Sequence, residues 1–296
     1  MTPAFINKIA TAVPDYDVHQ RFLDFAPSLL PDSRSRALFH RMAERCQIEH
    51  RYSFLKPHTD TGQLDDQELY RPGHFADTAK RMNLYKQHGF SLACRAIDQL
   101  FETIQKNDIT HLIITSCTGF YAPGVDLEIV NHYGLRSDTE RSLIGFMGCY
   151  AGLNALKLAR HIVRSEPNAG VLVVNLELCT LHLQETNKLE DILSFLIFAD
   201  GCAASFISAT PHGIDLQSFT STIIPESEGL ITWHVGNSGF EMALSGLIPS
   251  TITASLPSYL SSILGANKVE DLTHWAIHPG GRSVLDAVQS AVKLPD

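Results

Sequence analysis

The stretch RSLIGFMGCYAGLNALKLARHIVRSEPNAGVLVVNLEL (141–178) decides the fold. Residues 141–149 form an apolar run that leads into a glycine-bearing turn, as a buried strand does at its end. Residues 150–165 carry apolar side chains at helical spacing, and residues 171–178 form a second apolar run rich in valine and leucine. The order strand, helix, strand predicts an α/β fold with a buried sheet.

The flanking sequence continues this alternation. Apolar β-branched runs predict further strands at 111–117, 202–208, 220–224 and 274–277. Apolar side chains at helical spacing predict further helices at 36–48, 90–105, 125–133 and 283–293. No repeat or flexible linker interrupts the chain, so we expect two halves that pack together rather than tethered domains.

Composition excludes several classes of protein. The chain has 296 residues and a formal net charge of −9, which disfavours a nucleic-acid or anionic-membrane binder. It has no apolar run of the roughly 20 residues that span a bilayer and no signal peptide, so a cytoplasmic location is expected. Six cysteines without CxxC spacing, and no HExxH motif, predict reduced thiols and no metal site.

Cys149 has the surroundings of a nucleophile. Gly148, Ala151 and Gly152 leave room for a substrate, and a helix is expected to begin directly after the cysteine. The positive end of a helix dipole lowers the pKa of a thiol, and free backbone N–H groups of the first turn can bind an oxyanion. A buried structural cysteine is the alternative that the residues alone leave open.

His278 is the second candidate catalytic residue. A short strand is expected just before it, and a Pro-Gly-Gly turn follows, so the imidazole would lie at a strand end, where α/β active sites collect. A neutral histidine near a thiolate can stabilise it or polarise a substrate carbonyl. An ordinary packed histidine is the alternative, and the two glycines count against it because they leave room for a ligand.

Several motifs, in this order, carry a family resemblance: TSCTGFYAPGVD (115–126), the block around Cys149, LVVNLELC (172–179), FADGCAAS (198–205), GLITWHVGNSGFEMALS (229–245) and IHPGG (277–281). Together they resemble the type III polyketide synthases, the chalcone synthase-like branch of the thiolase superfamily, from about residue 5 to the end. The HPGG sequence distinguishes this branch from relatives that elongate fatty acids.

The resemblance implies a layered αβαβα thiolase fold of two related halves, usually as a homodimer. The first half, residues 1–210, would carry the nucleophile Cys149, and the second, residues 211–296, the catalytic His278. An acyl-CoA starter would load on Cys149, and decarboxylation of malonyl-CoA would supply the enolate that extends it. The product would cyclise to a pyrone, resorcinol or related aromatic ring. CoA thioesters would be substrates, and no cofactor is implied.

The resemblance also assigns roles to individual residues. Phe198 matches a gatekeeper between the CoA tunnel and the cavity, and Trp233 stands where many members have another gating phenylalanine. Without the family both would be plain core aromatics. The cavity lining would include Cys117, Thr118, Glu177, Cys179 and His182. Ala122 stands where plant members place a methionine that reaches the partner's cavity, so a longer starter could fit.

CoA phosphates would be held by Arg41 and Arg45, with Gly280 and Ser283 also at the CoA site. The third basic position of the family corresponds to Leu38, which implies a weaker grip. Without the family, the two arginines would be a solvated helix face.

The sequence departs from the family at its C-terminus. The family's third catalytic residue is an asparagine about thirty positions after the histidine, but no asparagine follows Asn267, so the second half is expected to be truncated. Two alternatives remain: a single-extension ketoacyl synthase-type condensing enzyme, or a non-catalytic acyl-CoA-binding or dimer-partner protein. The starter, the number of extensions and the cyclisation mode depend on cavity volume, which these motifs do not set.

Overall fold

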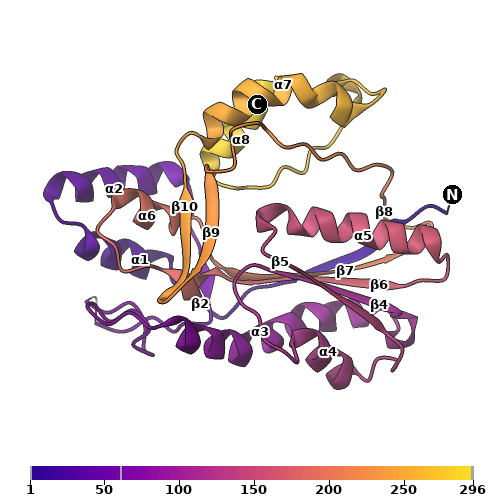
Figure 1. Ribbon diagram of the computed structural model, residues 1–296, viewed down its shortest axis with the longest axis horizontal. Coiled ribbons are helices and arrows are strands. Elements are labelled where there is room, and N and C mark those ends of the chain that lie inside the picture. Colours follow the sequence, from indigo (N-terminus) through magenta and orange to yellow (C-terminus); the bar gives the residue numbers. More distant parts are fainter. Residues whose placement is uncertain (1, 61, 295–296) are drawn as a thin grey trace.

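Helices cover both faces of a six-stranded mixed sheet in the computed structural model, which describes residues 2–60 and 62–294 (Figure 1). The strand order is β5-β4-β6-β7-β1-β8. The strands are β1 (Phe5–Ala12), β4 (His111–Ser116), β5 (Glu140–Gly145), β6 (Val171–Leu178), β7 (Asp200–Ser208) and β8 (Ile214–Asp215). A separate pair joins β2 (Tyr16–Asp17) to β3 (Tyr52–Ser53). The expected α/β class is confirmed.

The centre of the sheet is buried on both faces. All six residues of β4 are buried, and its side chains alternate between two cores: Leu112 and Ile114 belong to one cluster and Ile113 to the other. β4 runs parallel to β5 and β6, whereas β7 is antiparallel to β6 and to β1. The carboxyl ends of β4, β5 and β6 therefore meet at one edge of the sheet.

The two cores are closed by helices from opposite sides. Helices α3 (Thr78–Phe101) and α4 (Val125–Tyr133) cover one face, and α5 (Ala151–Ser165) covers the other (Figure 1). The buried face of α5 consists of Ala151, Ala155, Ala159 and Val163, at the i, i+4 spacing that faces one side of a helix. The helices expected at 125–133 and 150–165 are confirmed.

The remaining helices flank this sheet. They are α1 (His19–Phe25), α2 (Ser33–Cys46), α6 (Leu189–Ser194), α7 (Ile248–Leu264) and α8 (Arg282–Val292). Asp32 caps α2 by accepting a 2.8 Å hydrogen bond from the Ser35 N–H. Among the described residues, none of the helices has both the length and the apolar composition that a bilayer crossing requires.

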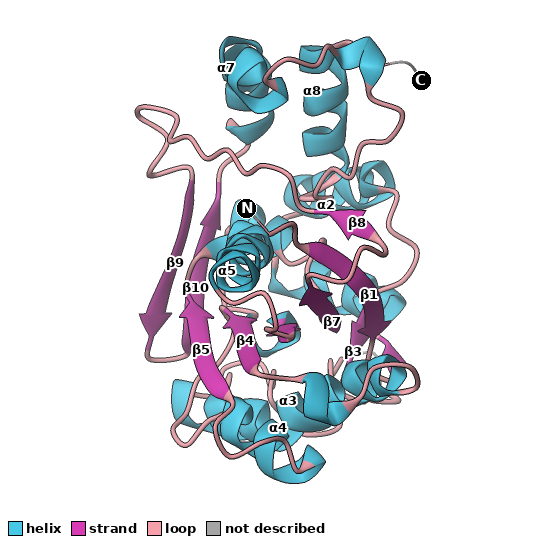
Figure 2. Ribbon diagram, turned by 90° about the vertical axis from the view of Figure 1, so that its right-hand side faces the viewer, coloured by secondary structure: helices cyan, strands magenta, loops and turns pink. Residues whose placement is uncertain are grey.

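The segment after β8 differs from the sequence expectation. It contains a hairpin of β9 (Ile231–Gly236) and β10 (Gly239–Leu244), with α7 and α8 beyond one end of it (Figures 1 and 2). The strands expected at 220–224 and 274–277 are wrong, because both stretches are irregular and, within the described residues, pair with no strand. Ile223, in the first stretch, is 89% exposed. An apolar run without a neighbouring strand leaves its backbone hydrogen bonds to water.

Candidate active site

A buried carboxylate lies where β4 and β6 end. Glu177, on β6, accepts hydrogen bonds from the Cys117 N–H at 2.9 and 3.0 Å and from the Thr118 hydroxyl at 2.6 Å. Burial raises the pKa of Glu177 to about 7, although the hydrogen bonds from Thr118 and Cys117 act in the opposite direction. Glu177 can therefore hold or release a proton near neutral pH.

Cys149 lies in a 3₁₀ turn, Gly148–Tyr150, between the end of β5 and the start of α5. It is the only exposed cysteine of the six. The expected helix start is confirmed, but the expected effect on the thiol is wrong: its pKa is raised. The atoms packed around the sulfur raise it most, and the negative charge of Glu177 adds to this.

Two more thiols share this neighbourhood. Burial raises the pKa of Cys117, and it raises the pKa of Cys179 far more. The charges of Glu177 and of the other two thiols also raise the pKa of Cys179. The structure thus brings Cys117, Cys179, Glu177 and Thr118 together near Cys149. That these residues line a substrate cavity stays a prediction. In this group Thr118 is fixed, because its hydroxyl also accepts a 2.8 Å hydrogen bond from the Leu178 N–H.

The loop after β4 is held tightly against α3. A Cβ on Gly119 would lie 2.1 Å from Cγ of the Tyr85 ring. The Tyr85 hydroxyl donates a hydrogen bond of 2.8 Å to the Ser116 side chain, which fixes the ring in this position. Only glycine fits at position 119.

The hairpin β9–β10 is anchored to the site by His182. This fully buried imidazole donates from Nε2 to the Thr118 carbonyl at 2.7 Å, and its Nδ1 accepts from the Phe240 N–H at 3.0 Å. The ring also stacks on Phe240, with centroids 4.2 Å apart. Burial lowers the pKa of His182 to about 3, so the ring is neutral. His182 was expected in the cavity lining, but both of its nitrogens are bonded to the backbone.

Trp233, on β9, joins the same anchor. Its indole Nε1 donates a 2.7 Å hydrogen bond to the Cys117 carbonyl, and its ring meets His182 edge-on at 5.5 Å. Trp233 therefore lies beside Cys117, and its expected role as a gating residue stays a prediction. Sequence reasoning missed Phe240, although the Gly-Asn-Ser-Gly turn at 236–239 between two apolar runs is a hairpin signal.

Phe198 is held by its backbone. Its carbonyl accepts a 2.9 Å hydrogen bond from Nη1 of Arg51, a buried guanidinium that also donates to the Phe195 carbonyl. Burial lowers the pKa of Arg51 to about 10, so it stays protonated at neutral pH. The half-buried Phe198 lines a cavity together with Phe22 and Thr180. Sequence reasoning missed Arg51, because it lies in a mixed segment without a motif.

His278 is not brought against Cys149. The strand expected before it is absent, and in the described part of the chain no hydrogen bond or ring contact joins the two side chains. Protein packed around the His278 ring lowers its pKa, so it is neutral at neutral pH. A Cβ on Gly281, in the same turn, would lie 3.9 Å from Ile197, so this turn neighbours the segment that carries Phe198.

The expected CoA-binding residues come from neighbouring elements. Arg41 and Arg45 lie exposed on α2, which packs against α8. Gly280 lies just before α8, and Ser283 is in its first turn. Neither arginine forms an ion pair with any described residue, so both guanidinium groups are available for an anion. Ala122 lies apart from this group, exposed in the loop between β4 and α4.

Comparison with known proteins identifies the same family along nearly the whole chain. Residues 2–211 match the model of chalcone and stilbene synthases, N-terminal domain, and residues 215–296 match that of the C-terminal domain. The chain is 30% identical to the α-pyrone synthesis polyketide synthase-like Pks18 of Mycobacterium tuberculosis, over 96% of this chain and 74% of that protein. It is also 30% identical to the 1,3,6,8-tetrahydroxynaphthalene synthase of Streptomyces peucetius, over 70% of this chain and 58% of that one.

A solved structure has the same fold. The C-terminal type III polyketide synthase domain of Steely1 from Dictyostelium superposes with a TM-score of 0.87 at 24% identity, covering 99% of this chain and 84% of that domain. The thiolase-like architecture expected from the motifs is confirmed.

Proposed function

The chain belongs to the chalcone and stilbene synthase family of type III polyketide synthases, and we propose that its Cys149 carries the acyl group during the reaction. Enzymes of this family are acyltransferases that condense acyl groups with malonyl-CoA by decarboxylation. The observation that carries the proposal is the position of Cys149. It is the one exposed thiol, it lies at the carboxyl ends of the parallel strands, and Glu177 and two further thiols surround it.

A thiol with a raised pKa needs a base, and we assign this role to His278. Its ring is neutral at neutral pH and can accept a proton. The Cys149 proton passes to the imidazole, the sulfur attacks the thioester carbonyl, and the CoA thiolate leaves with the proton that the imidazolium returns. This step requires the turn at 278–281 to approach Cys149 when acyl-CoA binds.

The exposed arginines of α2 support the CoA part of the proposal. Arg41 and Arg45 lie one helical turn apart, and guanidinium groups suit phosphate oxygens. Gly280 and Ser283 would complete the site from the start of α8. The chemistry needs only CoA thioesters as substrates and no separate cofactor, since the decarboxylation itself supplies the carbon nucleophile.

The product we propose is a pyrone, resorcinol or related ring formed after several extensions. The relative from Mycobacterium tuberculosis bears α-pyrone synthesis in its name. Phe198, which lines a cavity, and Trp233, which lies beside Cys117, would be the gating aromatics. A linear product after a single extension would instead identify a ketoacyl synthase-type enzyme. Absence of any malonyl-dependent CoA release would identify a non-catalytic acyl-CoA-binding protein.

We further propose a homodimer across the edge strand β5. Among the residues that the structure describes, β5 pairs with a strand on one side only, and its Leu143 is 60% exposed. Exposed apolar side chains continue onto the turn and α5, at Phe146, Met147, Tyr150 and Leu153. A second copy placed by a two-fold axis would cover this surface, and the exposed Ala122 loop lies in the same half of the chain.

Acyl transfer can be tested by intact mass. The chain is incubated with acyl-CoA starters of increasing length, and we expect one added acyl group, which peptide mapping places on Cys149. Cys149→Ala should abolish it, whereas Cys94→Ala, which removes a half-buried thiol on α3, should not. With [2-14C]malonyl-CoA, the loaded protein should release labelled cyclic products. Acylation that survives in Cys149→Ala would disprove the assignment.

A further inference from the structure

Three potential metal ligands gather at the end of the sheet opposite to Cys149. His111 begins β4 and Glu140 begins β5, where the two residues are partners in the parallel ladder. Glu166 follows directly after α5. One ligand atom of each side chain lies within 4.8 Å of the other two. This group could not be predicted from the sequence, because its members are 26 to 55 positions apart and match no metal-binding motif.

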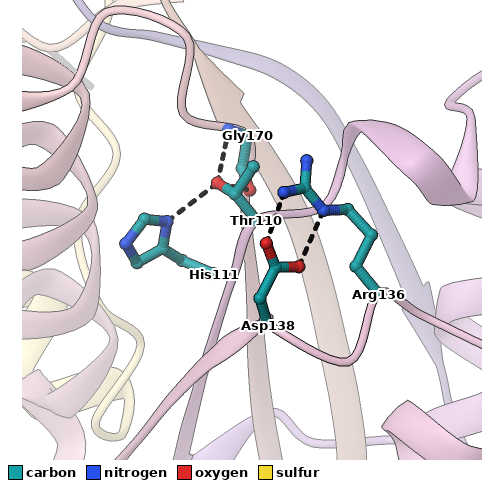
Figure 3. Close-up of polar contacts among 5 residues, drawn as sticks. All are labelled: Thr110, His111, Arg136, Asp138 and Gly170. Atoms are coloured by element: carbon teal, nitrogen blue, oxygen red, sulfur yellow. Dashed lines mark hydrogen bonds and ion pairs between the residues drawn. The ribbon is translucent and has the colours of Figure 1, made fainter.

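The buried imidazole is oriented toward the two carboxylates by Thr110. The Thr110 hydroxyl donates to the Gly170 carbonyl at 3.2 Å and accepts from the Gly170 N–H at 3.1 Å. Its oxygen also lies 2.8 Å from His111 Nδ1 (Figure 3), and we assign the tautomer in which Nδ1 carries the proton and donates it to this hydroxyl. The other nitrogen, Nε2, then presents a lone pair. A hydrogen bond at the second nitrogen is the usual support of a metal-binding histidine.

The Nε2 lone pair faces negative charge. It lies 3.7 Å from Oε2 of Glu140, beyond hydrogen-bond distance, and the His111 side chain is only 7% exposed. Within the described residues, no hydrogen bond or ion pair engages the carboxylate of Glu166. A lone pair and two carboxylates that face one another repel unless a cation lies between them.

The neighbouring arginines do not supply that cation. Arg136 is engaged with both carboxylate oxygens of Asp138, at 2.9 and 2.6 Å (Figure 3). Arg141 pairs with Asp126. The separation of 3.7 Å between His111 Nε2 and Glu140 Oε2 is close to the roughly 3.4 Å between two ligands of a tetrahedral ion with bonds of about 2.1 Å.

We propose that His111, Glu140 and Glu166 bind a divalent first-row transition-metal ion that joins β4, β5 and the end of α5. One imidazole and two carboxylates form a mixed nitrogen and oxygen set suited to Mn²⁺, Co²⁺ or Zn²⁺, with water completing the coordination of the exposed side. Because the ligands come together only in the folded chain, the ion stabilises the fold. The six residues of β4 separate this site from Cys117, so it stands apart from the proposed acyl transfer.

The direct test is Mn²⁺ titration followed by electron paramagnetic resonance, in which bound Mn²⁺ loses the signal of the free ion. We expect one Mn²⁺ per chain. Glu140→Gln and Glu166→Gln should each weaken binding at least about tenfold. Glu44→Gln, which removes one exposed carboxylate from α2, should leave it unchanged. Binding that is absent, or unaffected in both ligand variants, overturns the proposal and leaves the trio as a histidine–glutamate ion pair.

Two further measurements separate this site from the thiol cluster and from a purely structural effect. Co²⁺ bound here should lack the intense near-ultraviolet band of a thiolate ligand, and that band would place the ion at the cysteines and overturn the proposal. Saturating Mn²⁺ should raise Tm by about 5 °C in the unmodified chain but not in Glu166→Gln.

Substitutions of Thr110 test the orientation of His111. Thr110→Val should weaken Mn²⁺ binding, whereas Thr110→Ser should bind Mn²⁺ as the unmodified chain does, because only serine keeps the hydroxyl.

Discussion

The indole of Trp233 and the backbone of Cys117 are joined by a 2.7 Å hydrogen bond between Nε1 and the carbonyl oxygen. This single bond ties the hairpin β9–β10 to the end of β4, across 116 positions of sequence. His182 and Phe240 pack edge-on against the indole beside this bond. The part of the chain beyond β8 is therefore held to the thiol cluster through polar contacts to the backbone, which keep their geometry whatever side chain stands at position 117.

Trp233→Phe should destabilise the chain by about 1 kcal/mol, because the ring is retained while the Cys117 carbonyl loses its partner. Urea unfolding measures this loss. The chain has two tryptophans, so Trp275→Phe is the matched control and leaves Trp233 as the only indole fluorophore. Product length should also change in Trp233→Phe and stay constant in Trp275→Phe. Equal behaviour of the two variants would show that the hydrogen bond does not contribute.

The neutral His182 should make the chain sensitive to acid. Its folded pKa of about 3 lies below the unfolded value of 6.5, so the unfolded state binds more protons between these values. Stability contributed by His182 is complete above about pH 6.5 and is lost as pH falls, by up to about 1.4 kcal/mol per pH unit. Urea unfolding of His182→Gln between pH 6.5 and 4 should show a shallower slope than that of the exposed control His161→Gln.

Alkylation of Cys149 should report the charge of Glu177. Iodoacetamide should label Cys149 before the other cysteines because it alone is exposed, and the rate should increase with pH up to a value above the ordinary thiol pKa of 9.0. Glu177→Gln removes a negative charge, so the curve should move to lower pH. Asp126→Asn, a carboxylate paired with Arg141, is the control. A plateau already reached at neutral pH would show a thiolate stabilised by the helix dipole instead.

Phe198→Ala should change the preferred starter or product length while lowering stability by only about 1 kcal/mol, because the side chain is half-buried and its backbone stays bonded to Arg51. The buried Phe22, on the same cavity, is the contrast: Phe22→Ala should cost about 3 to 5 kcal/mol. Product analysis by mass spectrometry and urea unfolding are the two measurements. A loss as large as that of Phe22→Ala would make Phe198 a core residue.

The central sheet could be predicted from the sequence because its strands are buried on both faces. The run 171–178 is β6 to the residue, since eight successive residues with few polar side chains fit only an interior strand next to helices on either side. The hairpin β9–β10 was harder to predict, because few of its side chains are buried and, among the described residues, its two strands pair only with each other. The run at 274–277 looks the same locally as a strand, but strand formation depends on a partner that local sequence does not reveal.

Several residues near Cys149 could be predicted from the sequence, but the position of His278 and the electrostatics could not. Cys117, Thr118, Glu177 and Cys179 do gather around Cys149, because each ends or follows a strand whose end lies at one edge of the sheet. The predicted direction of the Cys149 pKa shift was wrong, because the helix start is a local feature, whereas burial of the sulfur and the charge of Glu177, 28 positions away, depend on the tertiary fold. The role of Arg51 could likewise not be predicted, because its partners Phe195 and Phe198 are more than 140 positions away in the sequence.

The close approach of the Tyr85 ring to Gly119 limits the substitutions that this enzyme can accept near its thiol cluster. Any side chain at position 119 would have to displace an aromatic ring that is fixed by its own hydroxyl, so random mutagenesis should recover almost no folded variants there. At position 117, Trp233 and Glu177 bind the backbone, so these hydrogen bonds persist when the half-buried thiol is exchanged. New product specificities should therefore arise by exchange of the thiol at 117, two residues from a position that tolerates no change.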